Sequence, residues 1–317
     1  MADEKEVNLW FEKYRPSALD ECILPNAMMK IFQGYIDKKE MPNLMLTGFQ
    51  GTGKTTLAKV MVKSLNADSM FIDCSTDNGK AMIETQVVPF ASTLSLGNQE
   101  VPKIIICDEC DGLSAAAQKS FRPVIEKYAL TTRFIFTANY PEKIIPALKS
   151  RCACFDFSQK KAEKPQMMVA IFKRCKHILE DNGIKYDSKV LKLFISKWHP
   201  DFRRILNELQ SYSAGYGEID EGILSAGTNN DIADQLYPLI LAKDFKKCKQ
   251  WVADSIDSPE DVFAALYSRL DDYVKPQNQA ECILQLANYQ EYSSHVMNQQ
   301  INTMALLLEL MSCAGGE

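Results

Sequence analysis

The stretch Asn-Leu-Met-Leu-Thr-Gly-Phe-Gln-Gly-Thr-Gly-Lys-Thr-Thr-Leu spans residues 43–57. Its apolar run at residues 44–46 is typical of a short buried strand, and apolar residues with helical spacing follow from Thr56. Between them, residues 48–55 fit the pattern G-x-x-x-x-G-K-[ST], which in this strand, turn and helix context indicates a phosphate-binding P-loop. The alternative, a glycine-rich turn that contains a lysine by chance, leaves the flanking elements unexplained.

The residue types of this P-loop suit a nucleoside triphosphate. Glycines let the backbone take positive φ angles and turn its N–H groups inward, so phosphate oxygens would lie at the amino end of the following helix. Lys54 would place its charge on the β- and γ-phosphates, and the Thr55 hydroxyl would be a ligand of Mg²⁺. The predicted nucleotide-binding residues of the loop are Gly51, Thr52, Gly53, Lys54, Thr55 and Thr56.

A second apolar run ends in two carboxylates. Residues 104–107 are typical of a fully buried parallel strand, and Asp108 and Glu109 follow at the end where such strands present ligand sites. This is a Walker B pattern, in which Asp108 would hold Mg²⁺, directly or through water, and Glu109 would act as general base on the attacking water. Asn139 follows another buried strand, residues 133–137, and is placed to hydrogen-bond that water or the γ-phosphate. In sequence alone, Asn139 could equally start a turn.

Length and composition limit the possible functions. The chain has 317 residues, 46% of them hydrophobic, which suggests two or three domains with ample apolar core. Its formal net charge is −5, whereas an autonomous nucleic-acid-binding domain is typically strongly basic. Any DNA contact must therefore come from a local patch or from several subunits together. The first residues are charged and no apolar run approaches about 18 residues. We therefore expect a cytoplasmic protein without a membrane span.

Ten cysteines fit reduced, mostly buried thiols better than a disulfide framework. A CxxC at Cys107 and Cys110 and a CxC at Cys152 and Cys154 could together supply four thiolates to zinc. Cys107 falls inside the predicted strand, and Cys110 shares its segment with the acidic residues assigned to Mg²⁺. Ordinary thiols are therefore the favoured interpretation.

Strand and helix patterns alternate between residues 44 and 157, which predicts an α/β domain with a parallel sheet. Strand patterns stop near residue 158, and the remainder shows helical periodicity. A stretch rich in Gly, Asn and Ser at residues 215–231 is typical of a linker. The expected fold class is α/β plus all-α, with domains at residues 1–158, 159–228 and 229–317.

Two further groups of residues have both a functional and an ordinary interpretation. The aromatic, basic and proline-stiffened segment at residues 10–16 could form a strap in which Tyr14, with Ile23, flanks a planar base. It could equally be a terminal arm packed on the core. Three cations are candidates for contact with DNA phosphate: Lys80, at the start of one predicted helix, and Lys119 and Arg122, on one face of another. Side chains of this kind are more often simply solvated.

Taken together, these motifs resemble the sliding-clamp-loader family of AAA+ ATPases, in the form of the large ATPase subunit of T4-like bacteriophages. The resemblance covers the whole chain and implies a AAA+ P-loop domain, a small helical lid and a C-terminal helical collar for oligomerisation. Residues 10–16 match the strap that such proteins place against adenine, and residues 20–25 look phage-like. The resemblance thus implies ATP contacts from Phe11, Glu12, Lys13, Tyr14 and Ile23.

The resemblance also assigns roles to three further residues. Arg151, in Ser-Arg-Cys at residues 150–152, matches an arginine that reaches the γ-phosphate bound by a neighbouring subunit. Asn139 matches sensor 1, and Arg203, in Pro-Asp-Phe-Arg-Arg, matches the sensor 2 arginine that acts within its own subunit. Pro123 departs from the family, which usually has a second arginine there.

The implied function is an ATP- and Mg²⁺-dependent switch in viral DNA replication. Four copies of such a subunit and one small loader subunit would form an open heteropentamer that opens a ring-shaped sliding clamp, places it on primer–template DNA and releases it after hydrolysis. One rival is a AAA+ DNA motor such as a branch-migration helicase, which would need a DNA-reading module. Another is a catalytically silent scaffold subunit, which the presence of Lys54, Thr55, Asp108, Glu109 and Arg151 disfavours.

Overall fold

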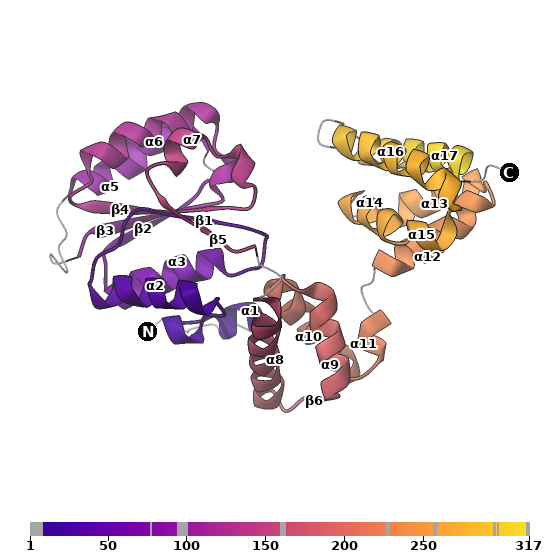
Figure 1. Ribbon diagram of the computed structural model, residues 1–317, viewed down its shortest axis with the longest axis horizontal. Coiled ribbons are helices and arrows are strands. Elements are labelled where there is room, and N and C mark those ends of the chain that lie inside the picture. Colours follow the sequence, from indigo (N-terminus) through magenta and orange to yellow (C-terminus); the bar gives the residue numbers. More distant parts are fainter. Residues whose placement is uncertain are drawn as a thin grey trace, which may run out of the picture. The chain divides into compact units, whose positions relative to one another are not determined.

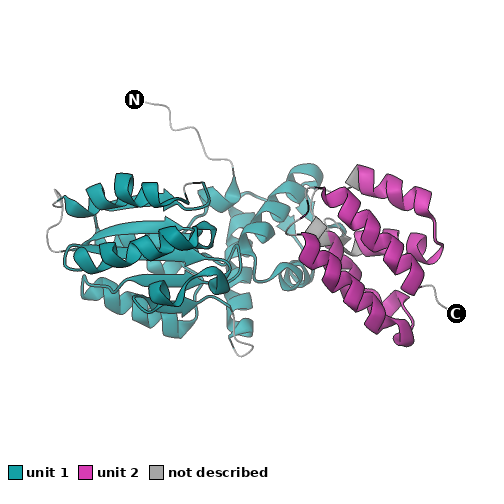
Figure 2. Cartoon of the chain, turned by 90° about the horizontal axis from the view of Figure 1, so that it is seen from above, with its two compact units in different colours: residues 1–223 teal, residues 224–317 magenta. Residues whose placement is uncertain are grey.

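The chain is divided into two compact units, residues 1–223 and 224–317 (Figure 2). The computed structural model describes residues 9–76, 78–93, 101–158, 163–225, 229–255, 259–293, 296 and 298–314. The first unit contains a sheet domain and a smaller helical part, and the second is helical. Each unit has its own hydrophobic core.

A five-stranded parallel sheet forms the centre of the first unit, as predicted. Its strands are β1 (Leu44–Thr47), β2 (Ser69–Asp73), β3 (Lys103–Asp108), β4 (Thr132–Ala138) and β5 (Ala153–Asp156). Their order is β2-β3-β4-β1-β5, and every neighbouring pair is parallel. The carboxyl ends of β1, β3 and β4 therefore meet at one edge of the sheet.

Helices cover both faces of this sheet (Figure 1). Because successive side chains of a strand point to opposite faces, Leu44 and Leu46 of β1 pack on one side and Met45 on the other. The first side is covered by α2 (Asn26–Asp37) and α3 (Lys54–Leu65). The second is covered by α6 (Ala115–Lys127), α7 (Pro146–Lys149) and a helical run of α4 (Lys80–Met82), the π-helical η2 (Ile83–Val87) and α5 (Val88–Ser92).

Short elements connect the main ones in this domain. They are α1 (Trp10–Lys13), η1 (Leu19–Glu21), η3 (Cys110–Gly112) and η4 (Pro141–Lys143). Ser114 is the N-cap of α6, because its side chain accepts a hydrogen bond from the Ala117 N–H.

The smaller part of the first unit contains α8 (Lys164–Asp181), α9 (Ser188–Trp198), α10 (Phe202–Tyr216) and α11 (Gly222–Ser225). It also contains two short parallel strands, β6 (Lys185–Tyr186) and β7 (Glu218–Ile219). The prediction that the chain is purely helical beyond residue 158 is therefore wrong. The boundary between the two units, at residues 223 and 224, falls inside the predicted linker at residues 215–231. The described first part of that stretch is structured, however, because it contains β7 and α11; residues 226–228 lie outside the described residues.

The second unit consists of α12 (Asn229–Leu241), α13 (Phe245–Ser255), α14 (Pro259–Ser268), α15 (Leu270–Tyr273), α16 (Pro276–Ser293) and α17 (Gln299–Cys313). Its core includes Leu236, Leu266 and Leu310, and the buried Tyr237 hydroxyl donates a hydrogen bond to the Leu266 carbonyl. No helix in the described part of the chain is long and apolar enough to cross a membrane.

Candidate functional site

The P-loop follows β1 at the carboxyl edge of the sheet and leads into α3. Gly51 and Gly53 have φ angles of +72° and +93°, which L side chains rarely adopt. A Cβ atom at Gly51 would lie 1.8 Å from Asp201 Oδ1, so this position also needs glycine because a residue at the start of α10 lies against the loop. The Phe202 N–H donates to the Gly51 carbonyl, which joins the P-loop to α10 directly.

Lys54 is buried at the first turn of α3. Its Nζ donates to the carbonyl oxygens of Gly48 and Phe49, both at 2.7 Å. Burial lowers the pKa of Lys54 to about 8, and the nearby carboxylate of Asp108 offsets part of that shift. The ammonium group therefore lies inside the loop, where it can exchange carbonyl partners for phosphate oxygens.

Two hydroxyl groups meet one oxygen of Asp108. Thr55 Oγ1 lies 2.7 Å from Asp108 Oδ1, and Thr137 Oγ1 lies 2.6 Å from the same atom. Adjacent ligands of an octahedral Mg²⁺ ion are about 2.9 Å apart, so Thr55 and Asp108 fit two neighbouring coordination positions. Sequence reasoning missed Thr137, because a threonine inside a strand has ordinary β propensity and gives no signal of its own.

Glu109 follows Asp108 in a left-handed backbone conformation with φ of +55°. Its N–H donates to Thr137 Oγ1 at 3.0 Å, so the same threonine orients both acidic positions. Burial raises the pKa of Glu109, and the neighbouring charge of Asp108 adds to the shift. A carboxylate with a raised pKa is a better proton acceptor, which suits a general base.

Asn139 lies just beyond β4, on the same edge. The Asp111 carboxylate accepts hydrogen bonds from the N–H groups of Asn139 and Tyr140, at 3.2 and 3.3 Å. Asp111 thus supports the strand end that carries Asn139, and the Asn139 side chain lines the pocket described next.

A polar pocket lies between the P-loop, the N-terminal segment and α10. It brings together ten of the residues predicted from sequence: Phe11, Tyr14, Gly51, Gly53, Lys54, Thr55, Thr56, Glu109, Asn139 and Arg203. The Arg203 guanidinium carbon lies 5.9 Å from the centroid of the Phe11 ring. The pocket is thus lined by three cations (Arg15, Lys54 and Arg203), the candidate base Glu109 and the P-loop backbone, which is a suitable set for a triphosphate.

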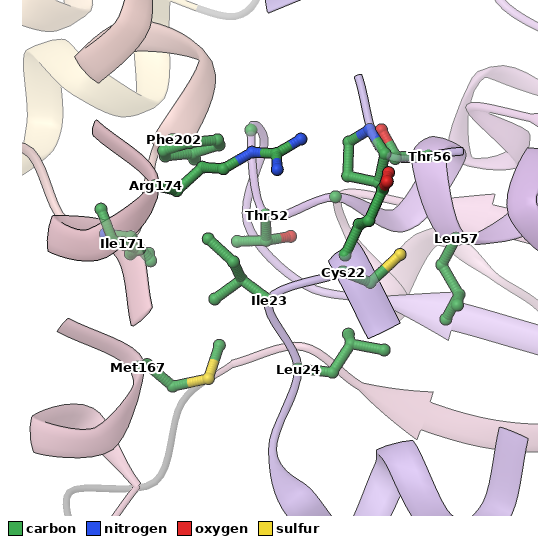
Figure 3. Close-up of a pocket in the computed structure, with 15 residues that line it drawn as sticks. Cys22, Ile23, Leu24, Thr52, Thr56, Leu57, Met167, Ile171, Arg174 and Phe202 are labelled. Carbon is green, nitrogen blue, oxygen red and sulfur yellow. The ribbon is translucent and has the colours of Figure 1, made fainter. Parts of the chain in front are cut away.

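An apolar pocket adjoins it and shares Gly51, Gly53, Thr56, Pro16 and Phe202 with it (Figure 3). The predicted residues Ile23 and Thr52 line it, and Met167, Ile171 and Arg174 of α8 form the opposite wall. The Arg174 side chain also donates to the Tyr14 carbonyl at 2.9 Å. Apolar walls with a few polar groups suit a planar base. Sequence reasoning missed the α8 residues, because Met167 and Ile171 belong to an ordinary helical apolar stripe and Arg174 is part of no recognisable motif.

The N-terminal segment packs on the core and also lies beside the polar pocket. Trp10 is buried and its N–H donates to Gln210 Oε1 in α10, as expected for a packed arm. Phe11 and Tyr14 line the polar pocket. Glu12 and Lys13 line neither pocket, and their side chains pair with Arg15 and Asp181.

The remaining predicted residues lie outside these two pockets. Arg151 precedes β5, at the amino edge of the sheet and opposite the P-loop, and it pairs with Glu126. Lys80 pairs with Glu84 at 3.1 Å, and Lys119 and Arg122 are exposed on α6. Arg151 therefore lies too far from the P-loop to contact a nucleotide bound by its own chain. Lys80, Lys119 and Arg122 are accessible to an outside partner.

The thiols considered for zinc do not form a set of four. Cys107 and Cys110 are buried, and the neighbour of Cys110 is Cys74, whose sulfur lies 3.9 Å away. Over the described residues, no group of three or more His, Cys, Asp or Glu side chains is arranged to hold a metal ion.

Comparison with known proteins agrees with this geometry. Residues 44–160 match the ATPase family associated with various cellular activities (AAA), and residues 163–225 match the AAA+ ATPase lid domain of the sliding-clamp-loader large subunit. The sliding-clamp-loader large subunit of Enterobacteria phage T4 is 34% identical over 97% of both chains. The chain belongs to the sliding-clamp-loader AAA+ family.

Other relatives of this clamp-loader chain cover different shares of it. The sliding-clamp-loader large subunit of Escherichia phage RB69 is 31% identical over 94% of both chains. The replication factor C small subunit of Methanococcus vannielii is 36% identical over 68% of both chains. Among solved structures, the Thermotoga maritima RuvB Holliday junction branch migration motor has a TM-score of 0.54 at 16% identity, over 70% of this chain and 79% of that one, which shows a shared fold alone.

Proposed function

We propose that this chain is the ATPase subunit of a sliding-clamp loader, which uses ATP binding to open a ring-shaped clamp and place it on primer–template DNA. The observation that carries the proposal is the likeness to a phage clamp-loader large subunit along 97% of the chain, together with a pocket that brings Lys54, Glu109, Asn139 and Arg203 together. Such work supports viral DNA replication, in the cytoplasm of a bacterial host.

Within one subunit, the proposed ATP site uses both pockets. The P-loop, Lys54 and Arg203 would hold the triphosphate, and the apolar pocket around Ile23 would hold adenine. Mg²⁺ held by Thr55 and Asp108 would neutralise charge on the β- and γ-phosphates. Glu109 would take the proton of the attacking water, with Asn139 orienting that water.

The site is completed by a neighbouring subunit. Arg151 lies at the opposite sheet edge from the P-loop, so it would meet the γ-phosphate bound by the next copy rather than its own. In related phosphoryl transfers an arginine supplied in trans contributes about 10³–10⁵ in rate. Hydrolysis would therefore depend on assembly, for which we propose four copies of this chain and one small loader subunit.

DNA binding is proposed to be shared between subunits. With a net charge of −5, one chain needs only a few phosphate contacts if several copies contribute. Lys80, Lys119 and Arg122 are exposed and available for this purpose. Recognition would follow the shape of the backbone rather than the base sequence.

The proposed domains are a AAA+ domain at residues 1–158, a lid at 159–228 and a collar at 229–317. The family matches at residues 44–160 and 163–225 support the first two. A AAA+ DNA motor is the main rival, and the RuvB-like fold does not distinguish the two because it is common to both. The relationship that extends through the C-terminal helices to phage clamp loaders favours the loader.

The test is the ATPase rate of the chain co-expressed with its small loader subunit, with DNA and clamp added separately and together. We expect strong stimulation only with both, lost in Arg151→Ala and kept in Lys149→Ala, a matched control that removes another cation two residues away. Stimulation by DNA alone that ignores the clamp would support the motor instead.

A further inference from the structure

The side chain of Arg151 is held by one carboxylate on α6. Its Nε and Nη2 both donate to Glu126 Oε1, at 3.0 and 2.5 Å, and its Nη1 donates to the Ala147 carbonyl at 2.7 Å. A guanidinium bound through Nε and one terminal nitrogen is held side-on, which fixes the plane of the group as well as its position. Arg151 is therefore oriented before any partner binds.

This arrangement leaves donors for an outside ligand. A guanidinium has five N–H donors, and the three bonds above use one each on Nε, Nη1 and Nη2. One N–H remains on each terminal nitrogen, and no residue in the described part of the chain accepts from these two. Two N–H groups on neighbouring nitrogens of one planar group suit the oxygens of a phosphate.

The surroundings of Arg151 favour an anion. Arg151 lines an open hollow at the amino edge of the sheet together with Lys30, Lys38 and Arg133. Glu40 is the one carboxylate among the residues that line it, so the positive charges outnumber the negative. An approaching triphosphate would therefore meet a positive potential at this edge.

We propose that Glu126 is a positioning residue for Arg151, holding the guanidinium side-on so that its remaining N–H groups face the γ-phosphate bound by a neighbouring copy. This inference rests on the proposed function of Arg151 in trans. Because the Arg151 side chain is already ordered, less conformational entropy is lost when it contacts the reacting phosphate.

A role in stability does not explain the pair. The Glu126 side chain is 55% exposed, and exposed ion pairs contribute little to folding. Arg122, one turn earlier on α6, lies 3.6 Å from the same carboxylate oxygen, so it is the second cation that faces Glu126. Because Arg122 also pairs with this carboxylate, its contribution must be tested separately.

The test measures the ATPase rate stimulated by clamp and saturating DNA in the assembled loader. We expect Glu126→Ala to lower the stimulated kcat by about tenfold to a hundredfold, since small misplacements of a reacting group have effects of this size. Glu126→Gln keeps the shape and an acceptor oxygen, so its loss should be smaller. The Kd for ATP of the isolated chain should stay unchanged, because Arg151 lies outside its own ATP pockets.

A matched control is Glu180→Ala on α8, which removes a carboxylate of 53% exposure that is paired with Lys176. It should retain the stimulated rate. Arg122→Ala removes the second partner of Glu126 and should reduce the rate less than Glu126→Ala does at saturating DNA.

A double-variant cycle tests whether Glu126 affects the stimulated rate through Arg151. In the Arg151→Ala background, Glu126→Ala should cause no further loss, because residues that act through one group are not additive. Losses that multiply in the double variant, or a rate that rises in Glu126→Ala, would overturn the inference. A loss in Arg151→Ala with none in Glu126→Ala overturns the inference alone, whereas a stimulated rate retained in Arg151→Ala overturns the proposed role of Arg151 as well.

Discussion

Lys54 is a buried lysine that can lose its proton within the pH range of ordinary buffers. Its pKa is lowered to about 8 by burial, and phosphate binding requires the charged form. The affinity for ATP should therefore be constant below pH 8 and should fall by about tenfold for each pH unit above it. Titration of ATP binding between pH 7.5 and 9.5 measures this.

The control for this pH dependence is Lys54→Arg, which stays charged across the range. Its affinity, even if lower, should not change with pH. A wild-type affinity that is constant up to pH 9.5 would show that Lys54 does not lose its proton in the free site.

A substitution at Glu109 should affect the hydrolysis of ATP but not its binding. Glu109→Gln keeps the shape of the side chain but cannot accept the proton of water, so the ATPase rate should fall by about 10²–10⁴-fold. The Kd for ATP should change little, because Lys54 and Arg203 carry the charge that meets the phosphates. Single-turnover hydrolysis and equilibrium binding check the two quantities. Equal losses in both would assign Glu109 a structural role.

At the residue scale, sequence patterns predicted those parts of the site that belong to contiguous motifs. The P-loop and the Asp108-Glu109 pair are short, and their chemistry fixes their spacing. Thr137 and Arg174 could not be predicted in this way. Each acquires its place only when β4 or α8 is brought beside the pocket by the fold, and nothing in the neighbouring sequence marks that.

At the scale of elements, α6 is fixed to the sheet by aromatic packing. Phe121 is fully buried, with its ring centroid 6.1 Å from that of Phe134 and 5.3 Å from that of Phe136, both edge-on. Phe121→Ala should lower the free energy of unfolding by about 3–5 kcal/mol through lost burial and the cavity that remains. Urea denaturation of the isolated chain measures it.

Leu130 provides the matched control, because it follows the same helix but is 93% exposed. Leu130→Ala should change the free energy of unfolding by less than about 0.5 kcal/mol. A similar effect from both substitutions would contradict the view that α6 is held by its buried face.

Periodicity and caps predicted the long elements well and the short ones poorly. The apolar stripe of α10 and the N-cap of α6 depend on residues a few positions apart, so patterns of this kind can be recognised in a sequence. The strands β6 and β7 have two residues each and lie more than thirty residues apart in sequence, so they form only because the intervening helices bring them together. Two residues are too few for an alternating pattern to be recognised.

At the scale of the molecule, we expect the two units to have different functions, ATP binding in the first and assembly in the second. Residues 1–223 contain both pockets and two clusters of core residues, and residues 224–317 have a separate helical core. A chain cut after α11, at residue 225, should therefore bind ATP with nearly unchanged affinity but should not assemble with its partners. Binding assays and light scattering test this. Assembly equal to that of the full chain would contradict the proposed collar.

The central claim is that ATP binding by this chain drives loading of a clamp, and hydrolysis allows the loader to leave. The most direct measurement follows a fluorescent clamp and a fluorescent loader on primer–template DNA. With Glu109→Gln and ATP, we expect the clamp to reach the DNA while the loader stays bound to it. With wild type, the clamp should remain and the loader should dissociate. Clamp loading that is equal with and without ATP would contradict the account.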